Sequence, residues 1–123
     1  NGTSVFQIQI GDSGGIESSG YAGAVNQGGT TVLYSGLGGA GFYLHNISAT
    51  AAAIYTASVT LVLENSAAFR WIGSGLMSRT TGSAEVYSTC GDKALSAELD
   101  RVRVTTINGT DAFDAGVISI SYE

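Results

Sequence analysis

The last thirty residues of the chain constrain its fold more than any other stretch. Two segments within them, Leu99 to Thr106 and Ala115 to Tyr122, alternate apolar with polar side chains and flank a run of Asn, Gly, Thr and Asp. Alternation with a period of two puts one set of side chains on each face of a β-strand, and the residues in between are typical of turns. This stretch therefore predicts two neighbouring strands, each with one face in the core and one in water.

The same alternation recurs upstream and predicts further strands. The clearest is Tyr55 to Glu64, and Phe69 to Arg79 is predicted to be its antiparallel partner across a turn at Asn65 to Ala68. Gly73 and Gly75 in that partner indicate a bulge or a close approach of another backbone. The other predicted strands are Ser4 to Ile10, Tyr21 to Val25, Thr30 to Tyr34, Phe42 to His45 and Ala84 to Cys90.

This pattern of elements predicts the fold class. About seven or eight short strands with turn residues between them are typical of an antiparallel β-sandwich of the jelly-roll-like kind. The alanine-rich run Asn46 to Ala53 could form one helical turn, and no longer helix is expected. The sequence therefore predicts an all-β fold.

Length and composition limit the number of domains and the classes of partner that the chain can have. With 123 residues the chain can build one core, so we expect residues 1–123 to form a single domain. Only 12% of the residues are charged, against about 25% in an average soluble protein, which leaves room for subunit contacts. The net charge of −5, with Lys93 as the single lysine, argues against nucleic acid and anionic membrane surfaces as partners. Because the chain starts inside a strand-like segment, we expect it to be a piece of a longer chain.

Cys90 and His45 are the single cysteine and the single histidine of the chain. One cysteine excludes an internal disulfide framework, and we interpret Cys90 as a small packed residue. One histidine without Cys or His companions makes no zinc site, so His45 is interpreted as structural or exposed. No run of about 18 apolar residues is present that could span a bilayer as a helix.

Asp111 and Asp114 lie three residues apart in the turn-rich segment near the end of the chain. They could bind Ca²⁺ together with backbone carbonyls, but the spacing of an EF-hand is absent and Asp in such loops usually caps turns. An ion pair of either carboxylate with Arg101 or Arg103 is equally compatible with the sequence. We predict no metal site and no cofactor.

Gly11 to Gly15 reads GDSGG, which matches the signature around the nucleophile of trypsin-like proteases and the G-x-S-x-G pattern of α/β-hydrolases. The first class needs its His and Asp upstream of the serine, whereas His45 follows Ser13. The second class needs a parallel sheet with crossover helices, which the sequence does not offer. We interpret the motif as a Gly-rich loop and the protein as a non-enzyme; a serine hydrolase built on Ser13 remains the alternative.

The aromatic residues are the remaining candidates for a binding surface. Tyr21, Tyr34 and Tyr43 border Gly-rich loops, and tyrosines on loops offer contact area and a hydroxyl at low entropic cost. We therefore expect these three to be exposed and take them as ligand-binding candidates. Trp71 alternates with Phe69 on a predicted strand and is interpreted as a core residue.

One resemblance adds to this reading. The segments that carry it are Leu95 to Thr106, Asn108 to Gly116 and Ile118 to Glu123, with Ile8 to Ile16, Ser19 to Tyr21 and Phe69 to Gly75. The first three segments look like the closing segment of many tail-fibre and related virion proteins of tailed bacteriophages. The others are similar to the amino-terminal and central stretches of the same proteins.

The resemblance implies a β-sandwich at the distal carboxy-terminal end of a phage tail fibre, commonly a homotrimer. Its outer loops would contact a polysaccharide or an outer-membrane protein on the host surface, and the location would be the virion. The expected function is therefore non-enzymatic receptor recognition and host attachment. The alternative is a purely structural virion module, for capsid decoration or for fibre assembly and trimerisation.

Overall fold

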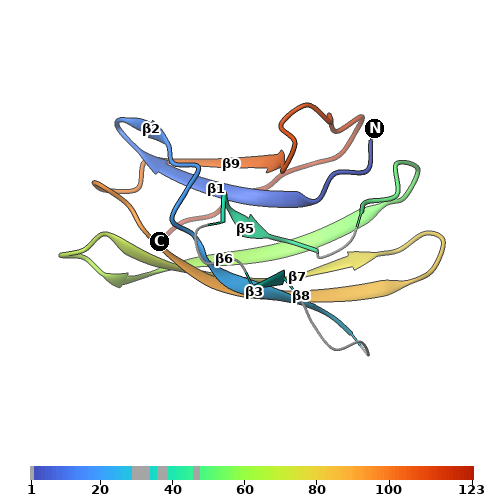
Figure 1. The fold of residues 1–123 in the computed structure, drawn as a ribbon, viewed down its shortest axis with the longest axis horizontal. Coiled ribbons are helices and arrows are strands. Elements are labelled where there is room, and N and C mark those ends of the chain that lie inside the picture. Colours follow the sequence, from blue (N-terminus) through green and yellow to red (C-terminus); the bar gives the residue numbers. More distant parts are fainter. Residues whose placement is uncertain (1, 29–33, 36–38, 46–47) are drawn as a thin grey trace.

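The fold is an all-β sandwich of two antiparallel sheets, which confirms the predicted fold class. The computed structural model describes residues 2–28, 34–35, 39–45 and 48–123. These residues form nine strands and no helix. Figure 1 shows the two sheets as layers, with β1 and β9 in one and β6, β7 and β8 in the other.

The smaller sheet is built around β1 (Phe6–Asp12). β9 (Arg101–Thr106) runs along one edge of β1 over the whole of Phe6 to Gly11. A strand has only two edges, so β5 (Phe42–Tyr43) and β2 (Gly15–Ile16) share the opposite edge of β1. β1 is consequently the central strand of its sheet.

The larger sheet has five strands in the order β4, β3, β8, β7, β6. Three of them are long, and each pairs with its sequence neighbour as an antiparallel hairpin. The bounds are β3 (Ala22–Gln27), β4 (Tyr34–Ser35), β6 (Tyr55–Asn65), β7 (Arg70–Arg79) and β8 (Glu85–Ala94). The predicted pair Tyr55 to Glu64 and Phe69 to Arg79 is thereby confirmed. Of the predicted strand Thr30 to Tyr34, residues 30–33 lie outside the described residues.

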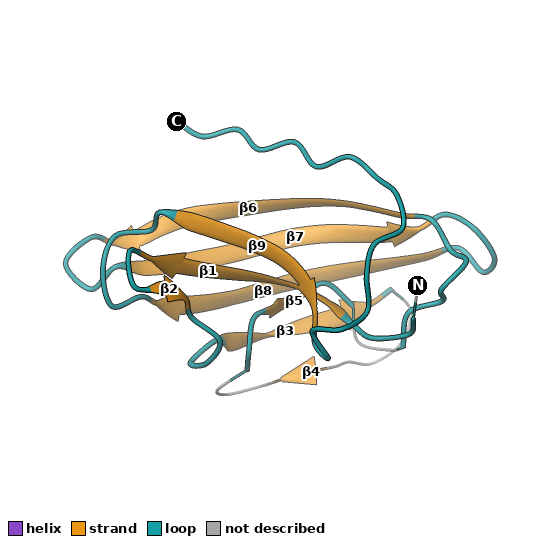
Figure 2. Ribbon diagram, turned by 90° about the horizontal axis from the view of Figure 1, so that it is seen from above, coloured by secondary structure: helices purple, strands orange, loops and turns teal. Residues whose placement is uncertain are grey.

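The predicted strand Ala115 to Tyr122 is wrong. Its alternation suits a strand, but within the described chain β9 pairs with β1 and not with the segment that follows it. Ser4 N donates to the Asp111 carboxylate at 2.9 Å, which ties the connection after β9 to the start of the chain. Figure 2 shows the last residues leaving the sandwich as an unpaired extended segment.

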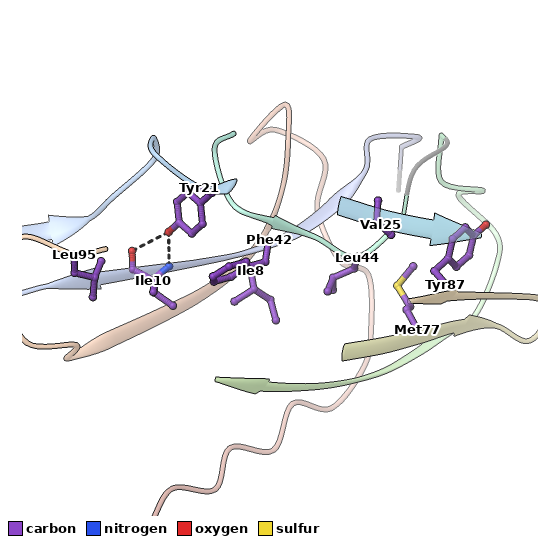
Figure 3. Packing of buried hydrophobic residues seen from close by; sticks show 9 residues of the cluster. All are labelled: Ile8, Ile10, Tyr21, Val25, Phe42, Leu44, Met77, Tyr87 and Leu95. Atoms are coloured by element: carbon purple, nitrogen blue, oxygen red, sulfur yellow. Dashed lines mark hydrogen bonds between the residues drawn. The ribbon is translucent and has the colours of Figure 1, made fainter. Parts of the chain in front are cut away.

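The core lies between the two sheets and draws on both (Figure 3). β1 contributes Ile8 and Ile10, and its other face is buried too, because Gln7 and Gln9 are covered. Gln9 Nε2 donates to Ala40 O at 2.7 Å, and its Oε1 accepts from Arg103 Nε at 2.8 Å. The buried cluster consists of Ile8, Ile10, Tyr21, Val25, Phe42, Leu44, Met77, Tyr87 and Leu95.

The predicted close approach of another backbone is confirmed at Gly75, whereas at Gly73 the neighbour is a side chain. A Cβ added to Gly75 would lie 2.5 Å from Ser58 O on β6, and one added to Gly73 would lie 3.0 Å from the ring of Phe42. Neither position has room for a side chain without displacing a neighbour. The bulge of this hairpin lies elsewhere, in β6 between Leu63 and Asn65.

Candidate functional site

Tyr21, the first of the three candidate tyrosines, is buried at 2% exposure, so the expectation that it is exposed is wrong. Its hydroxyl accepts from Ile10 N at 2.7 Å and lies 3.1 Å from Ile10 O and 2.9 Å from Glu17 O. Its ring packs edge-on against Phe42 at 5.1 Å between centroids. Burial raises the pKa of the Tyr21 hydroxyl. Tyr21 therefore satisfies backbone groups of β1 and offers no free surface to a ligand.

The other two candidates are placed less completely. The side chain of Tyr34 lies outside the described residues. Tyr43 is half-buried and packs against the core, and it lines a cavity of about 20 Å³ together with Tyr21 and Gly39. A space of that volume holds no more than a water molecule. That Tyr43 contacts a ligand stays a prediction.

The GDSGG motif forms the hairpin between β1 and β2, with Ser13 exposed on the turn. Asp12 is buried: its carboxylate accepts from Ser96 Oγ at 2.5 Å and from Gly14 N at 2.8 Å, and these bonds, the one from Ser96 foremost, lower the pKa of Asp12. His45 Nε2 accepts from Phe6 N at the other end of β1. The two ends of β1, Phe6 and Asp12, are six residue steps apart, which is about 20 Å, so the His45 imidazole does not reach Ser13.

The Asp111 carboxylate is hydrogen-bonded within the turn and to the start of the chain. It accepts from Asn108 Nδ2 and from Ser4 N, each at 2.9 Å, and these bonds lower its pKa. Asp114 is exposed nearby. Arg101 instead pairs with Asp100 at 2.5 Å. Within the described ranges no three or more His, Cys, Asp or Glu side chains gather where they could hold a metal ion.

A groove lies at the end of the sandwich where the β6–β7 hairpin turns. It has a volume of about 230 Å³ and is open to solvent. We call it the groove, and it is lined by Leu63, Ser66, Phe69, Trp71, Glu98 and Leu99. Its walls come from two parts of the chain, the β6–β7 hairpin and the connection between β8 and β9.

The β6–β7 turn positions the aromatic wall of the groove. Asn65 Oδ1 accepts from Ala67 N at 2.9 Å and from Ala68 N at 3.2 Å, which closes the turn. Phe69 follows with φ of 46°, a left-handed conformation that is unusual for a bulky residue and is often found at functional sites. Trp71 comes two residues later, on the core-facing side of β7, and is half-buried.

The groove combines apolar surface with few polar groups. Trp71 offers its ring rather than its N–H, because Nε1 is covered and finds no acceptor among the described residues. Glu98 and Ser66 are exposed and supply a carboxylate and a hydroxyl at the rim. Pockets of this composition bind molecules with an apolar face and hydroxyl groups, since the ring covers the face and the carboxylate accepts from the hydroxyls.

The sequence reading missed this groove. Trp71 does pack against the core, as predicted, but it also lines the groove, which was not expected; Glu98 was not singled out. The sequence did hold one indication of the groove. Trp71 lies close to a turn, and a residue near the end of a strand is less completely covered by the opposite sheet than one in the middle. That Glu98 lies across from Trp71 depends on the pairing of distant strands, which alternation alone does not reveal.

Comparison with known proteins identifies no relative: no family model, no curated protein and no solved structure matches the chain. In the part of the chain that the structure describes, no helix is long and apolar enough to cross a membrane.

Proposed function

We propose that this domain is a host-attachment module of a phage tail fibre and that the groove binds a sugar unit of a cell-surface polysaccharide. The observation that carries the proposal is the half-buried Trp71 ring facing a solvent-open groove of about 230 Å³ with Glu98 at its rim. A sugar ring has one apolar face of C–H groups and a periphery of hydroxyls, which this pair of side chains complements. The resemblance of the sequence to tail-fibre proteins supports the same function.

Attachment through such a groove would be weak for one copy. The groove is shallow and open, and a ligand held by one aromatic face and one carboxylate leaves much of its surface in water. Presentation of the domain as a homotrimer would make the second and third contacts intramolecular, which raises avidity by about 10²-fold or more without any new contact. The proposal therefore predicts strong binding to repeating polysaccharides and weak binding to single sugars.

A structural role in the virion is the second candidate, and one observation favours it. The last residues of the chain expose several large apolar side chains in a segment that pairs with no described strand. Such a segment suits assembly with another protein chain. The two roles are compatible in one domain, but only attachment requires the groove to bind.

The experiment compares binding of the purified chain and two groove variants to a panel of bacterial surface polysaccharides and to intact cells. Glu98→Gln removes the carboxylate charge at an exposed position, and Trp71→Ala removes the ring. Ile72→Ala, the neighbour of Trp71 on the opposite face of β7, is the matched control for loss of apolar volume. We expect the control to bind as the parent does, and the two groove variants to bind at least tenfold more weakly.

Two results would contradict the proposal. One is that no polysaccharide and no cell binds the parent chain. The other is that Glu98→Gln and Trp71→Ala retain full binding while their thermal unfolding shows that they are folded. The purely structural role predicts the first result, so the same experiment separates the two candidates.

A further inference from the structure

Residues 115–123, which we call the tail, expose an apolar strand sequence. Their four large apolar side chains are strongly exposed: Val117 at 93%, Ile118 at 67%, Ile120 at 73% and Tyr122 at 94%. The tail forms no strand pairing and no hydrogen bond with any of the residues that the structure describes. Figure 2 shows it running past the β6 side of the sandwich and away from it. A run of exposed apolar residues of this kind marks a surface that another chain covers.

The same side of the sandwich lacks a cover. β6 is the edge of the larger sheet and β9 is the edge of the smaller one. Leu63 on β6 and Val102 on β9 both face the core side of their sheets, yet they are 44% and 40% exposed. We call this surface the open flank; it consists of the core-facing side chains of Val59, Leu61, Leu63, Val102 and Val104.

The free edge of β9 is ready to accept another strand. Ile10 N and Ile10 O bond to the Tyr21 hydroxyl on the far edge of β1, so the pair Ile10 and Val102 is not hydrogen-bonded across β1 and β9. In an antiparallel ladder, the N–H and C=O of a residue in a non-hydrogen-bonded pair point away from the partner strand. Those of Val102, and of Val104 two residues later, therefore point away from β1 to the free edge of β9. Natural sheets protect such edges with charged side chains or proline. β9 has no proline, and its charged residues, Arg101 and Arg103, lie on the face of the strand that points away from the core.

We propose that the tail adds as a strand to the free edge of β9 in a second copy of this chain. The side chains of the tail alternate in the way that this position requires. As a strand, the tail has Ile118, Ile120 and Tyr122 on one face and Ser119 and Ser121 on the other. A strand beside β9 lies over β6, so the apolar face covers the open flank and the serines face water. Length, periodicity and edge geometry thus agree on one occupant.

The second copy, rather than the same chain, supplies the strand. In the single chain the tail begins beside the open flank, because Phe113 packs on Phe6 at 5.3 Å between ring centroids, and still leaves its apolar side chains in solvent. An eight-residue strand is about 27 Å long and covers a strip about 10 Å wide. Two exchanged strands, counting both surfaces of each, bury on the order of 1,000 Å², which is about the smallest area expected of a specific interface between proteins. Exchange of one element between identical chains is a low-cost route to an oligomer.

Sedimentation of the full chain over a range of concentrations tests the exchange. We expect the parent to form a closed oligomer, and Ile118→Asp with Ile120→Asp to raise its dissociation constant at least tenfold. Ser119→Asp with Ser121→Asp adds the same charge to the opposite face of the tail and is expected to leave the oligomer intact. The substituted residues are exposed in the single chain, so the monomer folds in either variant. A parent that is monomeric at every concentration, or two variants that assemble equally, would overturn the proposal.

Disulfide crosslinking identifies which chain supplies the strand. All variants carry Cys90→Ser, because the thiol of Cys90 is exposed and not packed as the sequence had indicated. A chain with Val102→Cys is mixed with a mass-tagged chain that carries Ile118→Cys or Ile120→Cys, and we expect an oxidised heterodimer of the two masses. If both cysteines are placed in one chain and oxidation gives only a closed monomer, the tail docks on its own chain and the exchange is refuted.

Discussion

Replacing Tyr21 by Phe removes a single oxygen atom from the centre of the protein. That oxygen fills a gap in the ladder along one edge of β1: β2 pairs with Gly11 and Asp12, β5 pairs with Gln7 and Ile8, and between them the Tyr21 hydroxyl is the acceptor for Ile10 N. Ile10 O, by contrast, also accepts from Glu17 N at 3.1 Å. Ile10 is fully buried, so no water can replace the hydroxyl as acceptor for its N–H.

The expected cost follows from the group left without a partner. A buried backbone N–H that loses its acceptor costs about 1–3 kcal/mol, so we expect Tyr21→Phe to lower the free energy of unfolding by about 2 kcal/mol. With a urea m-value of about 2 kcal/mol per M, the midpoint shifts down by about 1 M. Urea unfolding followed by the fluorescence of Trp71, the single tryptophan, measures this shift.

Tyr55→Phe is the matched control. The Tyr55 hydroxyl also accepts from a backbone N–H, that of Thr50 at 2.8 Å, but this bond is exposed and water can replace it. We expect a loss of less than about 0.5 kcal/mol for the control. Equal losses for Tyr21→Phe and Tyr55→Phe would refute the reasoning, because burial of the orphaned N–H would then not matter.

Three further predictions follow from the contacts of the sandwich. Glu17→Gln weakens the ion pair with the buried Lys93 ammonium and should cost about 2 kcal/mol in urea unfolding, whereas unchanged stability would show that Lys93 is satisfied without it. Gly75→Ala places a Cβ 2.5 Å from Ser58 O and should lower the free energy of unfolding by about 1–3 kcal/mol; a melting temperature equal to that of the parent would contradict the close approach. The hydrogen bond from the Ser96 hydroxyl lowers the pKa of Asp12 in the folded chain. The ionised Asp12 carboxylate therefore stabilises the fold at pH values above its ordinary pKa of 3.8, and this stabilisation is lost as the pH falls below 3.8. Asp12→Asn should therefore flatten the pH dependence of stability below the ordinary pKa of 3.8, and parallel curves for parent and variant would count against the assignment.

The strands could be predicted from the sequence because each carries its own signal. Alternation over Tyr55 to Glu64 and over Phe69 to Arg79 is local, and the turn between them fixes their pairing. The observed strands Tyr55–Asn65 and Arg70–Arg79 differ from these predictions by one residue at most at each end. Local periodicity was sufficient here since sequence neighbours became sheet neighbours.

Predictions failed where pairing was not local. The tail has the alternation of a strand, and it was expected to pair with the strand before it, β9. The turn between them does not bring the two together, because Asp111 in that turn is bonded to Ser4 at the start of the chain. Tyr21 follows a Gly-rich run and was therefore expected on an exposed loop. Its ring turns inward since Ile10, eleven residues earlier, presents at that point a backbone N–H for which β2 and β5 supply no acceptor.

The groove could not be predicted for the same reason. Trp71 lies on β7 and Glu98 on the connection between the two sheets, so their proximity depends on β8 pairing with β7 and on the course of the chain from β8 to β9. Phe69 has a backbone conformation that no pattern in its neighbours indicates. A binding surface assembled from the ends of several strands becomes visible only when the strand order is known.

Fluorescence titration of Trp71 tests the proposed attachment most directly, because the chain has one tryptophan and it lines the groove. We predict that a polysaccharide that binds the protein shifts or quenches this emission in a saturable way, and that Glu98→Gln moves the midpoint at least tenfold to higher concentration. A polysaccharide that binds while the emission stays constant would contradict the account, since the ligand would then occupy another surface.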